Sequence, residues 1–297
     1  MYLPNQAGRR RATAVFLLPS LIGVLVFCLL PILASAVFSF TDYDLLMPMN
    51  TMNFVGFDNY RRILTGSEFP KVLTHTFTYL VLYLPLILLT SVCEALILNK
   101  SFRGHDIFRT ITYTPVITSW VAAAVVWQWV LSGKYGLLNQ MLAGIGITGP
   151  AWLNSKEWAM PGVVLAAVWK DTGYYALMVL AALKSIDPAY YEAASIDGAG
   201  SFKKLTAITL PLISPTLFLL IVINIIYGLQ VFDSVLIMTN GGPGGATTVF
   251  LERIYKYAFK QYKMGLASAY SWILFALILV FTAIQFWLQK KWVNYDA

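Results

Sequence analysis

Two adjacent charged residues, Lys170 and Asp171, interrupt a long apolar stretch of this chain. Carrying a charge to the centre of a bilayer costs about 2.5–3.5 kcal/mol or more, so charged groups in such stretches usually face protein or water. Neighbouring residues on a helix point about 100° apart, so Lys170 and Asp171 need not pair with each other. Either each has a partner on another helix, or both hold a polar solute. In the second case Tyr174, one turn further on the same face, supplies a ring on which a hydroxyl-rich solute can stack.

A second polar line follows some fifty residues later. Its members recur at spacings i, i+3, i+4 and i+7, which place them on one face of a helix: Asn224, Tyr227, Gly228 and Val231. Gln230 and Asp233 lie on nearby faces, although Asp233 is close to the expected outer end and can simply meet water. The two lines together define the candidate solute-binding residues.

The elements that must position these residues are membrane helices. Of the 297 residues, 58% are hydrophobic and only 12% are charged, and the mean hydropathy is +0.67. A soluble chain of this length could not hide so much apolar surface. Runs long enough to cross about 30 Å of hydrocarbon predict an all-α integral membrane protein with six continuous spanning helices, in which internal prolines mark kinks: 14–40, 72–98, 107–131, 158–183, 212–238 and 266–288.

The basic residues predict the orientation of these helices. Arg9, Arg10 and Arg11 precede a first apolar run that is too long for a signal-peptide core, so we expect a retained helix with a cytoplasmic N-terminus. Six spans then place both termini inside, which gives a cytoplasmic arm (1–13), a membrane domain (14–289) and a cytoplasmic tail (290–297). The net charge of +7 is interpreted as topology and anionic-lipid contact rather than nucleic-acid binding.

A polar segment between the fourth and fifth runs, 185–211, carries helix-boundary signals. Asp187 can cap a helix, Pro188 suits its first position, and Gly198 can adopt the left-handed turn that ends it. The short helix would present the Glu192 charge beside Ala193 and Ala194, whose small side chains allow another surface to come close. The segment is either an ordinary solvated loop or a docking site for a soluble partner.

Several other chemistries find no support in the sequence. His75 and His105 each stand without the neighbours that a metal site needs, so we expect no metal. Cys28 and Cys93 fall within spans, where a thiol acts as a small apolar group, so we expect no disulfide. No catalytic constellation is visible.

The glycine-rich segment 241–245 lacks the Lys-Ser/Thr of a phosphate-binding loop, and we interpret it as an external turn. The amphipathic helix expected after it, 249–263, would carry Glu252 and Arg253 on its polar face. That helix either lies on the membrane surface or meets an external protein.

The polar segment resembles the signature loop of the membrane subunits of binding-protein-dependent ABC importers. The match comprises Glu192-Ala193-Ala194, Gly198 four places later, and the Ile208-x-Leu210-Pro211 ending, all in register. The resemblance implies a coupling helix held in a cleft of a cytoplasmic ATPase. Its coupling residues would be Glu192, Ala193, Ala194, Asp197 and Gly198.

Further segments are similar to the maltose-type sugar permeases of that class: 54–60, 239–243, 258–259 and 265–269. This resemblance implies a permease subunit in a bacterial inner membrane that translocates a carbohydrate, expected to be an oligosaccharide. Its partners would be a second homologous membrane subunit, two ATPase subunits that bind ATP and Mg²⁺, and an extracytoplasmic solute-binding protein. The chain itself would be no enzyme and would hold no cofactor.

By the same resemblance, positions in the fourth and fifth spans contact the sugar. The candidates are Lys170, Asp171, Tyr174, Asn224, Tyr227 and Gly228, with Gln230 added from its nearby face. Gly228 and Val231 offer no polar side chain where the maltose-type permease has asparagines, so we do not expect the substrate to be held as maltose is.

Two alternative functions remain open. An ion-coupled carrier would use Lys170, Asp171 and Asp233 as ion or proton sites, but such carriers often have inverted repeats and broken helices. The sequence shows neither, and a carrier would not need an ATPase-docking loop. A membrane receptor or scaffold would not need polar lines inside two spans. Transport that depends on ATP and on a binding protein would separate these functions.

Overall fold

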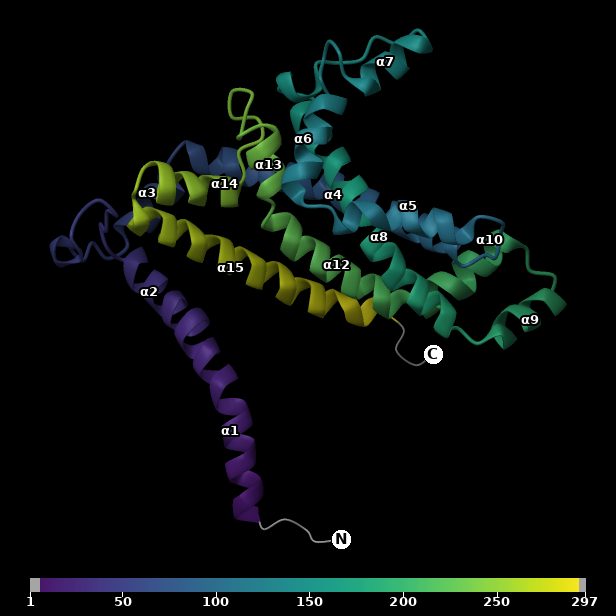
Figure 1. Ribbon diagram of the computed structural model, residues 1–297, viewed down its shortest axis with the longest axis horizontal. Helices are drawn as coiled ribbons and strands as arrows, with labels where there is room; N and C mark the ends of the chain where they lie inside the picture. The colour runs from purple at the N-terminus through teal and green to yellow at the C-terminus, as the bar shows by residue number, and fades with distance from the viewer. Residues whose placement is uncertain (1–5, 294–297) are drawn as a thin grey trace. The chain divides into compact units, whose positions relative to one another are not determined.

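The computed structural model describes the backbone of residues 6–293 and the side chains of residues 13–293. Within these residues the chain is helical, with two isolated β-bridges and no strand (Figure 1). The predicted all-α fold is therefore confirmed. The outer parts of the expected cytoplasmic arm and tail, 1–5 and 294–297, lie outside the described residues.

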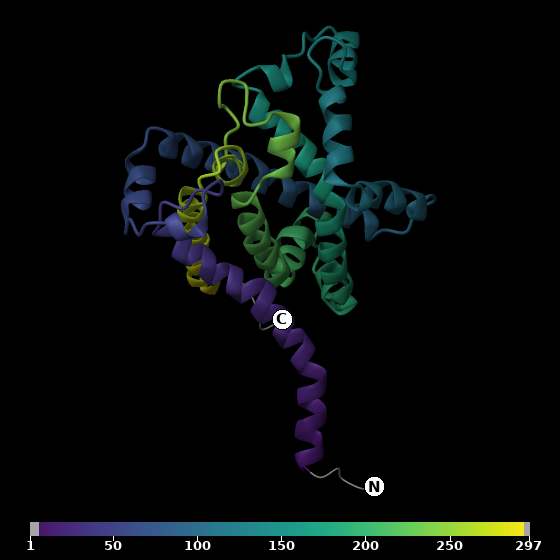
Figure 2. The same ribbon diagram turned by 60° about the vertical axis from the view of Figure 1, so that its left-hand side comes forward.

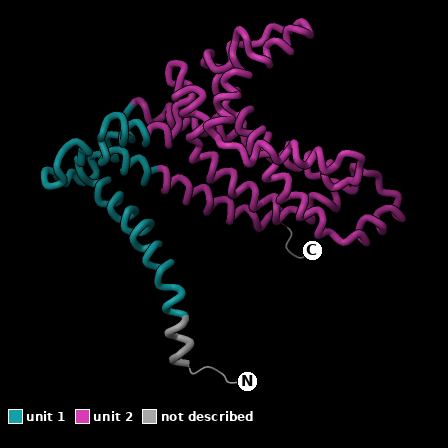
Figure 3. The backbone as a smooth tube through the Cα atoms, viewed as in Figure 1, with its two compact units in different colours: residues 1–66, 254–273 teal, residues 67–253, 274–297 magenta. Residues whose placement is uncertain are grey.

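The chain divides into two compact units, residues 1–66 with 254–273 and residues 67–253 with 274–297 (Figure 3). The first unit contains α1 (Gln6–Val24), a π-helical turn (Leu25–Leu29), α2 (Leu30–Ser39) and α3 (Asp58–Thr65). The most apolar 18-residue window of the helix over Thr13–Ser39 contains no buried residue, as expected of a surface that faces lipid or another subunit.

The second unit carries the remaining helices. They are α4 (Glu68–Leu98), α5 (His105–Ile117), α6 (Trp120–Val130), α7 (Leu137–Gly144), α8 (Ala159–Ser185), α9 (Pro188–Ile196), α10 (Ser201–Lys204), α11 (Leu210–Leu212), α12 (Ser214–Leu229) and α13 (Asp233–Met238). Two further helices, α14 (Phe250–Tyr255) and α15 (Met264–Leu288), run across the boundary between the units.

Helix α8 is the centre of the second unit. It packs against α4, α5 and α12, and two-thirds of its most apolar window is buried. Gly173 allows the closest approach, because a Cβ there would overlap the backbone carbonyl of Thr112 in α5. Helices α9 and α10 lie at one end of this packed group and α13 lies at the other (Figure 1).

Within the described residues, four helices are long and apolar enough to span a membrane: Thr13–Ser39, Glu68–Leu98, Ala159–Ser185 and Met264–Lys291. They correspond to the predicted first, second, fourth and sixth spans. The predicted third span corresponds to a bent pair of helices, and the predicted fifth span, 212–238, overlaps the second helix of another bent pair. The chain bends by 105° between α5 and α6 and by 67° between the Ser201–Leu212 and Ser214–Leu229 helices. The two helices α5 and α6 run in different directions in Figure 2.

The expectation of continuous, unbroken spans is therefore wrong for these two. Between α5 and α6, Thr118 and Ser119 have extended backbones with ψ of 141° and 139°. In the fifth span, the chain bends at Ile213 between two prolines, Pro211 and Pro215, and α12 ends at Leu229 instead of reaching residue 238. Hydropathy measures the length of an apolar run but does not detect a change in the direction of the helix axis. It therefore predicted a single helix for each run.

Candidate functional site

A cavity of about 440 Å³ lies beside the middle of α8, and we call it the central cavity. Two interruptions of helical structure border it: Trp120 directly follows the break between α5 and α6, and residues 230–232 connect α12 to α13. Irregular backbone at membrane depth is tolerated where it lines a cavity. Half of the lining residues are aromatic: Tyr79, Tyr83, Trp120, Asp171, Tyr174, Tyr175, Tyr227, Gly228, Gln230, Val231, Phe232, Asp233, Ser234 and Leu251.

Asp171 is held in place by a residue of α4. Its Oδ2 accepts a hydrogen bond of 3.0 Å from the Tyr83 hydroxyl. The Tyr83 ring stacks on Tyr79, with centroids 5.3 Å apart and planes 15° from parallel. The hydrogen bond occupies one oxygen of Asp171 and fixes the carboxylate, which has further acceptor capacity for hydroxyl groups.

Lys170 has a different environment from its neighbour. Its side chain is buried, and its Nζ donates a hydrogen bond of 3.0 Å to the carbonyl of Val116, near the end of α5. The Nζ also lies 5.8 Å from the centroid of the Trp120 ring. Lys170 and Asp171 thus have partners on different helices, and contact of either residue with a solute stays a prediction.

Five of the seven predicted solute contacts line the central cavity: Asp171, Tyr174, Tyr227, Gly228 and Gln230. Lys170 and Asn224 do not. Asn224 is fully buried, and its Nδ2 donates to the Leu220 carbonyl in its own helix at 2.8 Å. Solute contact by any of the seven remains a prediction.

The sequence reasoning missed the contribution of α4. Tyr79 and Tyr83 are one turn apart within a predicted span, and phenol hydroxyls at i and i+4 in an apolar run were the available signal. Trp120 and Phe232 could not be found in this way, because each reaches the cavity through a break that the hydropathy pattern does not contain.

The polar segment forms the short helix that its boundary signals predicted. Helix α9 spans Pro188–Ile196, the Asp187 side chain accepts a hydrogen bond from the Ala189 amide at 2.9 Å, and Gly198 has φ of +73°. Four predicted coupling residues are exposed and the fifth, Ala194, is half-buried. The Ile196 side chain is also 88% exposed, so the surface of α9 presents apolar as well as charged groups.

Two hydrogen bonds tie α9 to the segment that leads into α12. The hydroxyls of Tyr191 and Thr209 are 2.9 Å apart, and the Lys204 Nζ donates to the Ser195 hydroxyl at 2.6 Å. Both join side chains of α9 to residues 204–209. These two bonds connect α9 directly to the segment that leads into the bend before α12.

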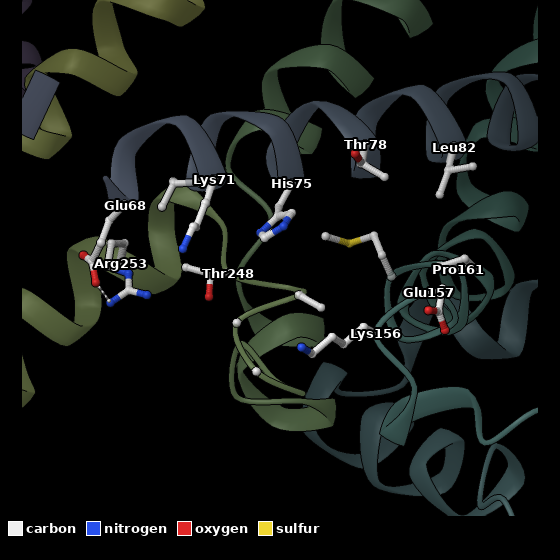
Figure 4. A pocket seen from close by; sticks show the side chains of 15 residues that line it. Glu68, Lys71, His75, Thr78, Leu82, Lys156, Glu157, Pro161, Thr248 and Arg253 are labelled. Atoms are coloured by element: carbon white, nitrogen blue, oxygen red, sulfur yellow. Dashed lines mark hydrogen bonds and ion pairs between the residues drawn. The ribbon is translucent and has the colours of Figure 1, made fainter. Parts of the chain in front are cut away.

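A second cavity, of about 650 Å³, lies near the N-terminal ends of α4 and α8, and we call it the outer cavity (Figure 4). Lys71, His75 and Lys156 point into it. Its other lining residues are Glu68, Val72, Thr78, Leu82, Glu157, Met160, Pro161, Gly244, Gly245, Ala246, Thr248 and Arg253.

The acidic groups of the outer cavity have partners within the chain. Glu68 pairs with Arg253 at 3.4 Å. The hydroxyl of Ser155 donates to Glu157 at 2.7 Å and holds the pKa of that carboxyl below its usual range. Among the described residues, Lys71 and Lys156 form no ion pair. The ammonium groups of Lys71 and Lys156 are thus available to pair with an acidic group from outside the chain.

The glycine-rich segment 241–245 forms a turn above a buried carboxylate. Gly241 has φ of +80°, and an added Cβ would lie 2.8 Å from Oε1 of Glu252, whose side chain is fully buried. The prediction that Glu252 lies on the polar face of an amphipathic helix is therefore wrong. The helix also differs from the expected 249–263, since α14 ends at Tyr255 and a π-helical turn, Lys256–Lys260, follows it. Helical periodicity placed Glu252 among the polar residues, but its packing beneath the glycine turn buries it.

The sequence matches the profile of one protein family, described as "Binding-protein-dependent transport system inner membrane component", over residues 87–294. The chain is 36% identical over 275 residues to the trehalose/maltose transport system permease protein MalF of Thermococcus litoralis, covering 91% of this chain and 90% of that protein.

Two solved structures of a bacterial alginate ABC transporter have the same fold, and each is 27% identical to this chain. The first contains an alginate pentasaccharide-bound periplasmic protein, has a TM-score of 0.84 and covers 96% of both chains. The second, described as involved in the import of the acidic polysaccharide alginate, has a TM-score of 0.85 and covers 97% of this chain and 98% of that one.

Proposed function

The chain belongs to the family of binding-protein-dependent transport system inner membrane components, and on that premise we propose that its central cavity is where a carbohydrate crosses the membrane. As a member of that family, it is a multi-pass permease subunit of an ABC importer for sugars or oligosaccharides. The observation that carries the proposal is the fixed Asp171 carboxylate among tyrosines and Trp120, beside two interrupted helices. Sugars bind through hydroxyl groups and through ring faces that pack on aromatic side chains, and this cavity offers both kinds of contact.

The proposed assembly contains a second homologous permease subunit, two ATPase subunits and a solute-binding protein. The exposed apolar window of the helix over Thr13–Ser39 supports a large membrane contact with another subunit. The exposed residues of α9 support docking to ATPases, which would bind ATP and Mg²⁺ and carry out hydrolysis. In this arrangement both termini and α9 lie in the cytoplasm, as the basic residues also favour.

The coupling step follows from how α9 is attached. When the ATPases close on ATP, α9 moves with them, and its bonds from Tyr191 and Ser195 to residues 204–209 carry the motion to α12. Helix α12 contributes Tyr227 and Gly228 to the central cavity, so its movement changes which side of the membrane the cavity faces. Opening of the ATPases after hydrolysis reverses the change.

Sugar uptake by the reconstituted complex in lipid vesicles tests this function. We expect accumulation to require both ATP and a solute-binding protein, and to persist when ion gradients are collapsed. An ion-coupled carrier stays the alternative, because interrupted helices also occur in that class. Uptake that continues without ATP and follows an ion gradient would replace the ABC proposal with the carrier.

We further propose that the outer cavity receives an acidic side chain of the solute-binding protein. Its support is the pair of available lysines and the closeness of the cavity to the glycine turn. Reversing both charges, with Lys71→Glu and Lys156→Glu, should lower the binding protein's stimulation of ATP hydrolysis about tenfold, with less effect at high salt. Lys134→Glu, outside this cavity, is the matched control and should change stimulation little. Equal losses in the control and the double variant would contradict this docking site.

A further inference from the structure

We propose that the central cavity admits sugars that carry no negative charge and rejects acidic ones, and that Lys170 positions the cavity wall instead of binding the sugar. This inference rests on the proposed transport function and narrows its substrate class. It assigns different roles to two adjacent residues, Lys170 and Asp171, that the sequence could only treat as a pair.

The charged residues that line the central cavity all carry negative charge. Its lining contains two carboxylates, Asp171 and Asp233, and no Lys, Arg or His among the described residues. A carboxylate or sulfonate on a sugar would be desolvated there beside like charges and would find no cation. A sugar hydroxyl, in contrast, can donate to Asp171, whose second oxygen is not used by Tyr83.

Lys170 is adjacent in sequence to Asp171 and is the nearest candidate cation for an acidic sugar. Its ammonium group already has a partner outside the cavity lining. Its Nζ donates to the Val116 carbonyl in the last turn of α5, a group that the helix break leaves without an intrahelical donor. A cation at a helix C-terminus is also favoured by the helix dipole. If Lys170 turned to an acidic sugar, the Val116 carbonyl would lose this hydrogen bond, so the contact at the helix break disfavours that role.

The same contact fixes one wall of the central cavity. Trp120 is the first residue of α6, directly after the break, and its ring lies 5.8 Å from the Lys170 Nζ. Lys170 therefore holds the end of α5 and the start of α6 in the arrangement that brings the Trp120 ring to the cavity. Loss of this contact should release Trp120 and weaken the binding of any sugar, whatever its charge.

The charges that line the central cavity lead us to expect a selectivity for uncharged sugars, which differs from the described substrate of a structural relative. The transporter with a TM-score of 0.85 is described as an importer of an acidic polysaccharide. The present chain shares that fold, and selectivity depends on the charges that line the site rather than on the fold. The absence of a lysine or arginine from the described lining is therefore the determining feature.

Equilibrium binding to the purified, lipid-embedded complex tests the inference, with no solute-binding protein present so that its own selectivity does not enter. The probes are a neutral malto-oligosaccharide series and an oligouronate series of the same lengths. We expect the wild type to bind the best neutral probe at least about tenfold more tightly than any uronate. The double variant Asp171→Asn with Asp233→Asn should narrow that ratio several-fold, because the like charges are gone.

Lys170→Gln separates the two roles of the lysine. If Lys170 only positions the cavity wall, the affinity of Lys170→Gln for neutral and acidic probes should fall by the same factor. The fluorescence emission of Trp120, identified by comparison with a Trp120→Phe variant, should also shift. Lys170→Arg should restore part of the affinity, since arginine can also donate to the Val116 carbonyl. A selective loss of uronate binding in Lys170→Gln would identify the lysine as an acid-sugar ligand and overturn the proposal.

The remaining outcomes distinguish this inference from the proposed function. Uronate binding tighter than neutral binding, in a complex that still transports sugar with ATP, would overturn the selectivity and leave the transport function standing. If no carbohydrate of either charge binds or is transported, the proposed function fails and the selectivity fails with it.

Discussion

Gly198→Asp and Glu192→Ala should each reduce the stimulation of ATP hydrolysis by the solute-binding protein about tenfold or more, and should abolish sugar uptake. Gly198 is exposed in α9's terminal turn with φ of +73°, and no other atom lies within 4 Å of an added Cβ. Aspartate adopts such a backbone at a cost of about 1 kcal/mol, so the variant should fold. Gly198→Asp places a charge in the proposed ATPase-docking surface, and Glu192→Ala removes the charge that the proposed docking uses; closely packed residues dominate the binding energy of such surfaces.

Gly104→Asp is the matched control for this result. Gly104 also has a left-handed backbone, with φ of +88°, and open space around it, but it lies in the loop before α5 instead of the coupling loop. It therefore reproduces the backbone strain and the added charge without touching the proposed docking surface. We expect near wild-type stimulation and uptake from this variant. Unchanged activity of Gly198→Asp and Glu192→Ala would remove the assignment of α9 as the coupling helix.

Gly173→Ala should have the second large effect, on assembly rather than on coupling. An added Cβ would overlap the Thr112 carbonyl oxygen, and two packed helix backbones cannot move apart as a side chain can. Overpacking of this kind costs about 1–3 kcal/mol or more. Because Asp171 and Tyr174 flank this glycine, a shift of α8 would also displace the central cavity. We expect a lower yield of intact complex, a lower Tm and weaker sugar binding.

Gly162→Ala in the same helix is the comparison variant. Gly162 is also buried, but an added Cβ there would lie 3.2 Å from the end of the Leu153 side chain, which can adjust. Its Tm should stay near that of the wild type, since alanine also favours the helix. A Gly173→Ala protein as stable as Gly162→Ala would show that α5 and α8 do not make their closest approach at this position.

The sequence predicted the local parts of this structure well because their causes are local. Asp187, Pro188 and Gly198 act within a few residues of themselves, and the structure has the helix boundaries that they predict. Four spans were located from hydropathy because each is a single continuous helix. The coupling-loop pattern and the family also followed from residues in register, and the family comparison confirmed the class of protein.

The candidate site was only partly predictable. Five of the seven predicted residues reach the central cavity, because helical spacing correctly places residues such as Asp171 and Tyr174 on nearby faces. Spacing does not say what lies opposite those faces. Tyr83 of α4 and Trp120 of α6 come from helices that the polar lines do not include. Asn224 shares the spacing of Tyr227 and Gly228, yet it turns back onto its own helix.

By itself, then, the sequence determined that the chain is a helical membrane permease with a short capped helix at 188–196, because composition, run length and short motifs are properties of neighbouring residues. Only the tertiary structure decided where the spans break and what each charge contacts. Lys170 and Asp171 are adjacent in the chain, but one holds the end of α5 while the other faces the central cavity. Glu252 has a polar side chain and is nevertheless buried beneath the glycine turn. Such contacts join segments far apart in sequence, and a helical period fixes the direction of a side chain without fixing its partner.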